Sequence, residues 1–197
     1  MDKHLNPQDP ENMLGYIDAL ADDLEKAWAL GSELPLPDFA GIERVVIAGM
    51  GGSAIGGDLL SAYLAPICPV PIISHRDYGL PAWAAGGETL VVCSSHSGNT
   101  EETLSSFEAA VERGCQVLAL CTGGRLRARA EDKGLPVWVF QHDGQPRTAI
   151  PYSFGMLLAL LCRLGLAHAA EDEIRDAEAV LREGRARLSA QSELSAN

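Results

Sequence analysis

The stretch Arg44-Val-Val-Ile-Ala-Gly-Met-Gly-Gly-Ser-Ala-Ile-Gly-Gly-Asp58 joins a short β-branched run to a loop rich in glycine. The run 44–48 shows no alternation of polar and apolar residues, which is typical of a strand buried on both faces. The loop allows the backbone to turn sharply and leaves amide N–H groups uncovered at the start of a helix. This stretch therefore predicts a buried strand, a tight turn and a helix N-terminus that can bind an anion.

Four more apolar runs of the same kind follow, at residues 70–74, 90–93, 116–120 and 137–140. Helical spacing between them predicts helices at about 54–64, 101–113 and 125–132. Strands that alternate with helices form a parallel sheet covered on both faces. We therefore expect the α/β class, as a three-layer α/β/α sandwich around a five-stranded parallel sheet. Pro136 suits an edge position for the fifth strand.

Further helices are expected on both sides of this unit. Asp9 as a cap, Pro10 and the apolar spacing from Met13 to Trp28 predict an amphipathic helix that ends at Gly31. The last strand is followed by a loop at 141–151, an apolar helix at 152–166 and a charged helix. We divide the chain into an N-terminal helix and connector (1–43), an α/β domain (44–167) and a charged C-terminal helix (168–197). That last helix either lies on its own domain or reaches a partner chain or a following domain.

Composition excludes several classes of protein. The 197 residues are 47% hydrophobic and 21% charged, which fits one globular domain. A net charge of −12 argues against nucleic acid as a partner. The longest apolar run, Met156–Cys162, is too short to span a membrane, and the N-terminus shows no export signal. Five cysteines without a CxxC pair suggest reduced, buried thiols in a cytoplasmic protein.

A second loop rich in donors follows the third predicted strand, in Cys93-Ser-Ser-His-Ser-Gly-Asn-Thr-Glu-Glu102. It gathers Ser95, Ser97 and Thr100 around Gly98 at the start of a helix. In an open parallel sheet, ligands bind beyond the carboxyl ends of the strands, and a strand order of 2-1-3-4-5 would place both loops beside that crevice. A phosphate dianion can be held there by amides and hydroxyls without a lysine. Helix capping is the simpler alternative role for these hydroxyls.

Other chemistries have less support. Gly49, Gly51 and Ala54 also match a dinucleotide fingerprint, for which Asp77 would be the acid at the end of the second strand. The sequence contains no nucleophile elbow around Ser53, no HExxH, no P-loop lysine and no cluster with metal-ligand spacing. We therefore expect neither a cofactor nor a metal.

The histidines near the loops are interpreted mainly as ordinary loop residues. His75 and His142 are interpreted as partly exposed loop residues. His96, on the hydroxyl loop, is expected to meet the phosphate end of a ligand rather than its reacting carbons, and an ordinary loop histidine is the simpler interpretation.

The two loop motifs together resemble the sugar isomerase (SIS) domain, and specifically the bifunctional phosphoglucose/phosphomannose isomerase family. Residues 76–81 and 145–154 resemble segments of that family in the same order, so the resemblance covers about residues 40–165. It implies a flavodoxin-like sheet and a sugar phosphate held by Gly52, Ser53, Ser95, Ser97 and Thr100. It also implies that Arg147 faces the reacting carbons and stabilises an enediolate. The sequence departs from the family at His96, where a tyrosine is usual, and at Thr148, where a small apolar residue is usual.

The resemblance implies an aldose-ketose isomerase that converts glucose 6-phosphate or mannose 6-phosphate to fructose 6-phosphate through a cis-enediolate. Proton abstraction from carbon needs a positioned base. In the family, a glutamate and a histidine of a second SIS domain do this work, and such a domain would follow residue 197. We therefore expect this chain to be the phosphate-binding N-terminal half, completed by a second SIS domain or by a homodimer. The alternative is a non-catalytic SIS module that binds a sugar phosphate as a sensor or scaffold.

Overall fold

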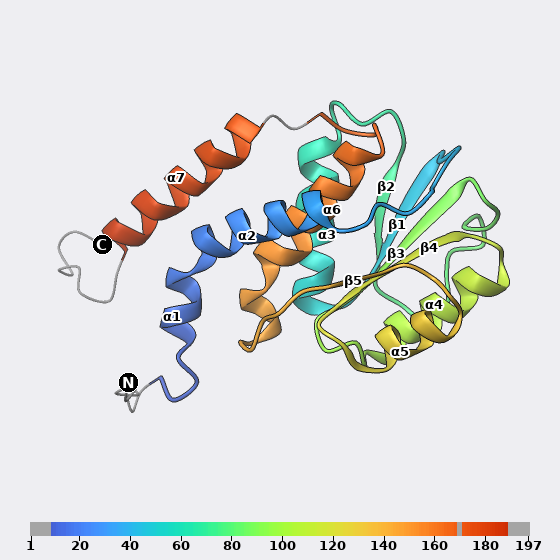
Figure 1. The fold of residues 1–197 in the computed structure, drawn as a ribbon, viewed down its shortest axis with the longest axis horizontal. Helices are drawn as coiled ribbons and strands as arrows, with labels where there is room; N and C mark the ends of the chain where they lie inside the picture. Colours follow the sequence, from blue (N-terminus) through green and yellow to red (C-terminus); the bar gives the residue numbers. More distant parts are fainter. Residues whose placement is uncertain (1–8, 169–170, 189–197) are drawn as a thin grey trace.

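The chain forms a five-stranded parallel sheet with the strand order β2-β1-β3-β4-β5, in a computed structural model that describes residues 9–168 and 171–188 (Figure 1). The strands are β1 (Arg44–Ala48), β2 (Ile72–His75), β3 (Thr89–Ser95), β4 (Gln116–Cys121) and β5 (Val137–Val139). This confirms the predicted α/β class, the parallel sheet and the edge position of the last strand. The strand order reverses between β1 and β3, and ligands of open α/β sheets bind beyond the carboxyl ends of the strands at such a point.

Helices cover both faces of the sheet. They are α1 (Met13–Asp18), α2 (Leu20–Glu33), α3 (Gly51–Leu64), α4 (Glu101–Glu112), α5 (Gly124–Asp132), the 3-10 turn η1 (Pro146–Thr148), α6 (Ile150–Arg163) and α7 (Glu171–Arg187). Figure 1 shows α4 and α5 on one side of the sheet and α2, α3 and α6 on the other. The described helices include none that is long and apolar enough to cross a membrane.

Burial on both faces explains why the strands lack polar alternation. Val45 and Ile47 of β1 belong to the core shared with α2, α3 and α6, whereas Val46 and Ala48 belong to the core shared with α4 and α5. All four side chains are at most 1% exposed. Each position of the strand therefore needs an apolar residue, and burying a valine or isoleucine stabilises the fold by about 1.5–3 kcal/mol.

The structure corrects several predicted boundaries. The single N-terminal helix is two helices, because the amide of Ala19 is shared between the carbonyls of Gly15 and Tyr16 in a local turn. The first helix begins at Met13 and not at Pro10 as predicted, although the Asp9 carboxylate does accept the amides of Met13 and Leu14 at 2.7 and 2.9 Å. Strand β3 extends two residues beyond its predicted end, through residues 94–95, because these serines are buried and paired with β4.

The charged helix lies on its own domain over the described residues. Arg182 of α7 forms ion pairs with Asp22 and Glu25 of α2, each at 3.0 Å, and the phenol of Tyr63 on α3 donates to Glu173 at 2.7 Å. Residues 169–170 and 189–197 of the predicted segment fall outside the described residues.

The cysteines form no disulfide in the part of the chain that the structure describes, and they are less buried than predicted. Cys93 and Cys121 are buried beneath α4 and α5, whereas Cys68, Cys115 and Cys162 are half-buried. Burial raises the pKa of Cys93 and Cys121, so both thiols stay protonated and act as small apolar side chains.

Candidate functional site

The glycine loop and the hydroxyl loop meet at the carboxyl edge of the sheet. The amide N–H of His96, directly after β3, donates to the hydroxyl of Ser53 in the first turn of α3 at 3.2 Å. Strand pairing brings this about, because Ala48 at the end of β1 lies level with Cys93 of β3. The N-termini of α3 and α4 therefore lie close together at this end of the sheet, where free amides and helix dipoles favour an anion.

The hydroxyl loop is a closed, hydrogen-bonded turn. The hydroxyls of Ser95 and Thr100 lie 2.9 Å apart, and the amide of Gly98 donates to the Ser95 hydroxyl at 3.1 Å. The Ser97 hydroxyl accepts the amide of Asn99 at 3.2 Å. Ser95 is buried, Thr100 is half-buried and Ser97 is exposed. Each hydroxyl has one donor and two acceptor sites, so the Ser97 and Thr100 hydroxyls retain capacity for a bound anion.

Two glycines make this close packing possible. Gly98 has a φ of +66°, and a Cβ atom there would lie 1.9 Å from the carbonyl oxygen of Gly123. A Cβ atom on Gly52 would lie 2.4 Å from the carbonyl oxygen of Pro146 in η1. The first glycine allows the hydroxyl loop to pack on the loop after β4, and the second allows η1 to approach α3.

The structure brings most of the predicted binding residues together. Ser53 contacts the hydroxyl loop directly, Gly52 precedes it in the same turn, and the three hydroxyl residues share one loop. Their role in binding phosphate stays a prediction, because the contacts between Ser97 and Asn99 and between Ser95 and Gly98 would also be made by residues that only cap α4.

Arg147 stands apart from these hydroxyls. It is exposed and lines a hollow of about 260 Å³ with Leu59, Phe154 and Leu181. Its guanidinium forms no hydrogen bond or ion pair with any residue that the structure describes. The backbone of η1 lies near α3, but the side chain would have to turn to reach a ligand between the two loops.

A histidine pair that was not predicted from the sequence lies beside the hydroxyl loop. Nε2 of His96 lies 3.0 Å from Nδ1 of His142, and the two rings are nearly perpendicular, at 84°. Each histidine follows the end of a strand, His96 after β3 and His142 after β5, and the ring of His96 also contacts Phe140. No local pattern in the sequence signals the contact, because the two histidines are 46 positions apart.

The surroundings of the pair favour neutral rings. Burial lowers the pKa of both histidines, and the charge of a protonated His142 lowers the pKa of His96 further. Asp23 and Asp143 oppose the effect at His142. Tyr152 donates to Asp23 at 3.3 Å, and burial followed by the charge of Asp23 raises the pKa of Tyr152 to about 12.

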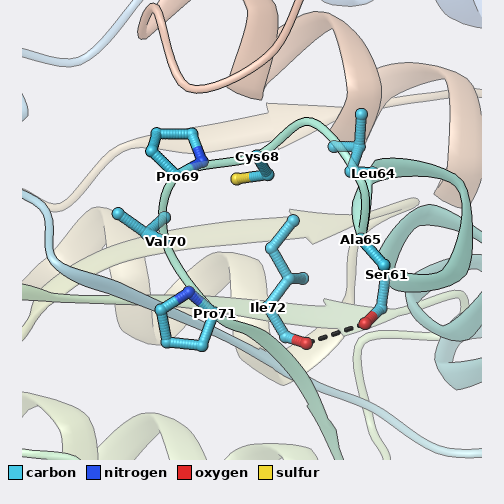
Figure 2. A pocket seen from close by; sticks show the side chains of 8 residues that line it. All are labelled: Ser61, Leu64, Ala65, Cys68, Pro69, Val70, Pro71 and Ile72. Carbon is cyan, nitrogen blue, oxygen red and sulfur yellow. Dashed lines mark hydrogen bonds between the residues drawn. The ribbon is translucent and has the colours of Figure 1, made fainter.

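A hollow of about 330 Å³ lies at the opposite edge of the sheet and is lined by the end of α3 and the segment that leads into β2 (Figure 2). Figure 2 shows the Ser61 hydroxyl donating to the carbonyl of Ile72, at 2.8 Å. Most of the other residues that line this hollow are apolar, among them Leu64 and Pro69. Because both loops lie at the carboxyl edge, this hollow is distinct from the candidate site.

Comparison with known proteins supports the resemblance that the motifs indicated. A scan against protein-family models finds no match. The chain is 43% identical over 169 residues to the bifunctional phosphoglucose/phosphomannose isomerase of Caldicellulosiruptor bescii, which covers 85% of this chain and 50% of that protein. The chain thus spans about half the length of this curated relative.

Solved structures show the same fold. A candidate phosphosugar isomerase from Clostridium difficile 630 superposes with a TM-score of 0.66 at 14% identity, covering 87% of this chain and 52% of that one. The NanR protein of Vibrio vulnificus, complexed with ManNAc-6P, superposes with a TM-score of 0.55 at 20% identity, covering 88% and 70%. The chain is therefore similar in sequence to bifunctional phosphoglucose/phosphomannose isomerases over about half of their length, and it has the SIS fold of phosphosugar isomerases.

Proposed function

We propose that this chain is the phosphate-binding half of an aldose-ketose isomerase that interconverts glucose 6-phosphate or mannose 6-phosphate with fructose 6-phosphate. The observation that carries the proposal is the 3.2 Å contact between the His96 amide and the Ser53 hydroxyl, which joins the two loops at one crevice. The curated relative with the same two activities in its name supports this assignment.

The phosphate would bind between the first turns of α3 and α4. Ser53, Ser95, Ser97 and Thr100 supply hydroxyls, and the backbone near Gly52 supplies amides. Each hydrogen bond to a charged phosphate oxygen contributes about 1.5–3 kcal/mol. The N-terminal dipoles of two helices add to this attraction, so the site needs no lysine.

Isomerisation needs further groups. A base removes a proton from the carbon next to the carbonyl, a cis-enediolate forms, and the proton returns to the neighbouring carbon while a second proton moves between the two oxygens. We assign stabilisation of the enediolate charge to Arg147, after its side chain turns toward the crevice. The base would come from a second SIS domain or from the partner in a homodimer.

Calorimetric titration of the chain with fructose 6-phosphate tests the proposal, with NAD as the competing ligand. We expect saturable binding of the sugar phosphate, no binding of NAD and very slow isomerisation by the chain alone. Binding of NAD in place of the sugar phosphate would support the dinucleotide site that includes Asp77, and would contradict the proposal.

A second candidate is a module that binds a sugar phosphate without converting it. The position of Arg147 favours this candidate, because its guanidinium lines an apolar hollow and not the crevice. A chimera that joins this chain to the remaining half of the Caldicellulosiruptor bescii isomerase distinguishes the two. Turnover by the chimera supports the isomerase, and tight binding without turnover supports the module.

A further inference from the structure

The histidine pair has one favoured arrangement of hydrogens. The Thr148 hydroxyl lies 2.8 Å from the carbonyl of Gln145, to which it donates, and 3.3 Å from Nε2 of His142. Nε2 of His142 therefore carries a hydrogen and donates to Thr148. This leaves Nδ1 of His142 as an acceptor, so His96 donates to it through Nε2.

That arrangement leaves Nδ1 of His96 as the free basic nitrogen of the pair. It accepts no hydrogen bond from the residues that the structure describes. Nδ1 is the ring nitrogen nearer to the main chain, and the main-chain amide of His96 donates to Ser53 in the candidate site. A proton that joins the pair therefore goes to a nitrogen next to the loops, and the resulting imidazolium keeps its hydrogen bond to His142.

The charges around the pair come from several elements. Asp23 and Lys26 of α2 form an ion pair at 3.1 Å, and these residues line a hollow of about 320 Å³ together with His142 and Asp143. Tyr16 of α1 and Tyr152 of α6 contribute neutral rings. With burial opposing protonation of both imidazoles, the pair is neutral at pH 7.5 when the crevice is empty.

A phosphate dianion in the crevice would change that balance. The donors of the two loops are neutral hydroxyls and amides, and Arg147 points elsewhere, so the dianion places two uncompensated negative charges near His96. An adjacent negative charge favours the protonated imidazole. Ligand and proton then each strengthen the binding of the other, because linkage between two binding events is reciprocal.

We infer that the His96–His142 pair takes up a proton when a sugar phosphate binds, and so supplies the cation that the two loops lack. The inference rests on the proposed function, since it assumes that the phosphate binds between these loops. His96 is then a further residue that selects dianionic ligands, and His142 positions it by holding Nε2.

Calorimetry with fructose 6-phosphate at pH 7.5, in two buffers with different heats of ionisation, measures the protons exchanged on binding. At this pH the phosphate is already a dianion, because its second pKa is about 6. We expect net proton uptake by the wild-type chain, and an affinity that rises about threefold from pH 8.0 to pH 7.0. His96→Gln keeps a donor for His142 but removes the accepting nitrogen, so it should bind more weakly and take up no proton. His168→Gln, at an exposed position outside the pair, is the matched control and should behave like wild type.

The outcomes separate the two proposals. Binding without proton uptake, or equal uptake by His96→Gln, overturns the inference and leaves the proposed function standing. No binding by wild type overturns both. Should His96→Gln fail to fold, the imidazole resonance of His96 in the wild-type protein, titrated by NMR with and without fructose 6-phosphate, decides the matter. Its midpoint must rise when ligand is bound, and an unchanged midpoint refutes the inference.

Discussion

The two loops at the carboxyl edge and the η1 turn beside them are built in different ways. The loops are fixed by hydrogen bonds, among them the contacts of His96 with Ser53 and of Ser95 with Thr100. The η1 turn is also anchored, but its Arg147 side chain is exposed and has no polar partner among the described residues. The difference indicates that the part proposed to bind phosphate is preformed, whereas the part proposed for catalysis must still be positioned.

The largest effect is expected from breaking the loops themselves. Gly98→Ala places a Cβ atom against the Gly123 carbonyl at a φ of +66°, so we expect a loss of stability of about 3 kcal/mol or more together with loss of ligand binding. Gly114→Ala is the matched control, because its φ is +69° but the space around it is open. That variant should lose only about 1–2 kcal/mol from the strained backbone. Equal losses in urea unfolding would show that the packing of the two loops is unimportant.

Arg147→Gln tests the proposed catalytic role of Arg147, whose side chain is not held in place by polar contacts with the described residues. In the chimera with the second half of the relative, we expect kcat to fall by about 10²- to 10³-fold, because a charge aimed at the enediolate is lost. The affinity of the isolated chain for fructose 6-phosphate should fall less than threefold, since the guanidinium makes no contact with the loops. A large loss of affinity with unchanged kcat would place Arg147 in phosphate binding instead.

Ser97→Ala combined with Thr100→Ala separates binding from folding within the hydroxyl loop. Loss of two hydrogen bonds to a dianion should weaken binding of fructose 6-phosphate about 100-fold or more. The melting temperature should change by only a few degrees, because Ser97 is exposed and Thr100 half-buried. Ser61→Ala, at the opposite edge of the sheet, removes a hydroxyl that also makes one hydrogen bond and should leave binding unchanged. Comparable losses of stability and affinity in the double variant would mean that the hydroxyls are structural.

The smallest effect concerns the unliganded histidine pair. A histidine whose pKa is lowered by folding binds fewer protons in the folded than in the unfolded state. Its neutral form therefore stabilises the fold above the unfolded pKa of about 6.5, and stability falls as the pH drops below that value. We expect urea unfolding of His142→Gln to depend less on pH between 7.5 and 5.5 than unfolding of wild type. A steeper dependence in the variant would contradict the environment assigned to the pair.

Much of the fold could be predicted from local pattern. The β-branched runs and the glycine loop predicted the strands, their parallel direction and the helix after β1, because burial on both faces restricts residue type at every position. Boundaries were less accurate. Ser94 and Ser95 are polar and suggested a loop, yet both continue β3, since their backbone pairs with β4 and the Ser95 side chain is satisfied by Thr100.

The candidate site was predicted less completely. The motifs identified the hydroxyls and Ser53, because these residues lie within two short stretches of sequence. The His96–His142 contact joins residues 46 positions apart and depends on how the loop after β5 folds back, which no local pattern specifies. The direction of the Arg147 side chain likewise depends on packing against α3 and α6.

The structure of the chain in complex with fructose 6-phosphate tests the central claim most directly. We predict that the phosphate lies between α3 and α4, within hydrogen-bonding distance of the Ser97 and Thr100 hydroxyls and of amides in the first turn of α3. A phosphate bound elsewhere, such as in the hollow beside Lys26 and His142, would contradict the account.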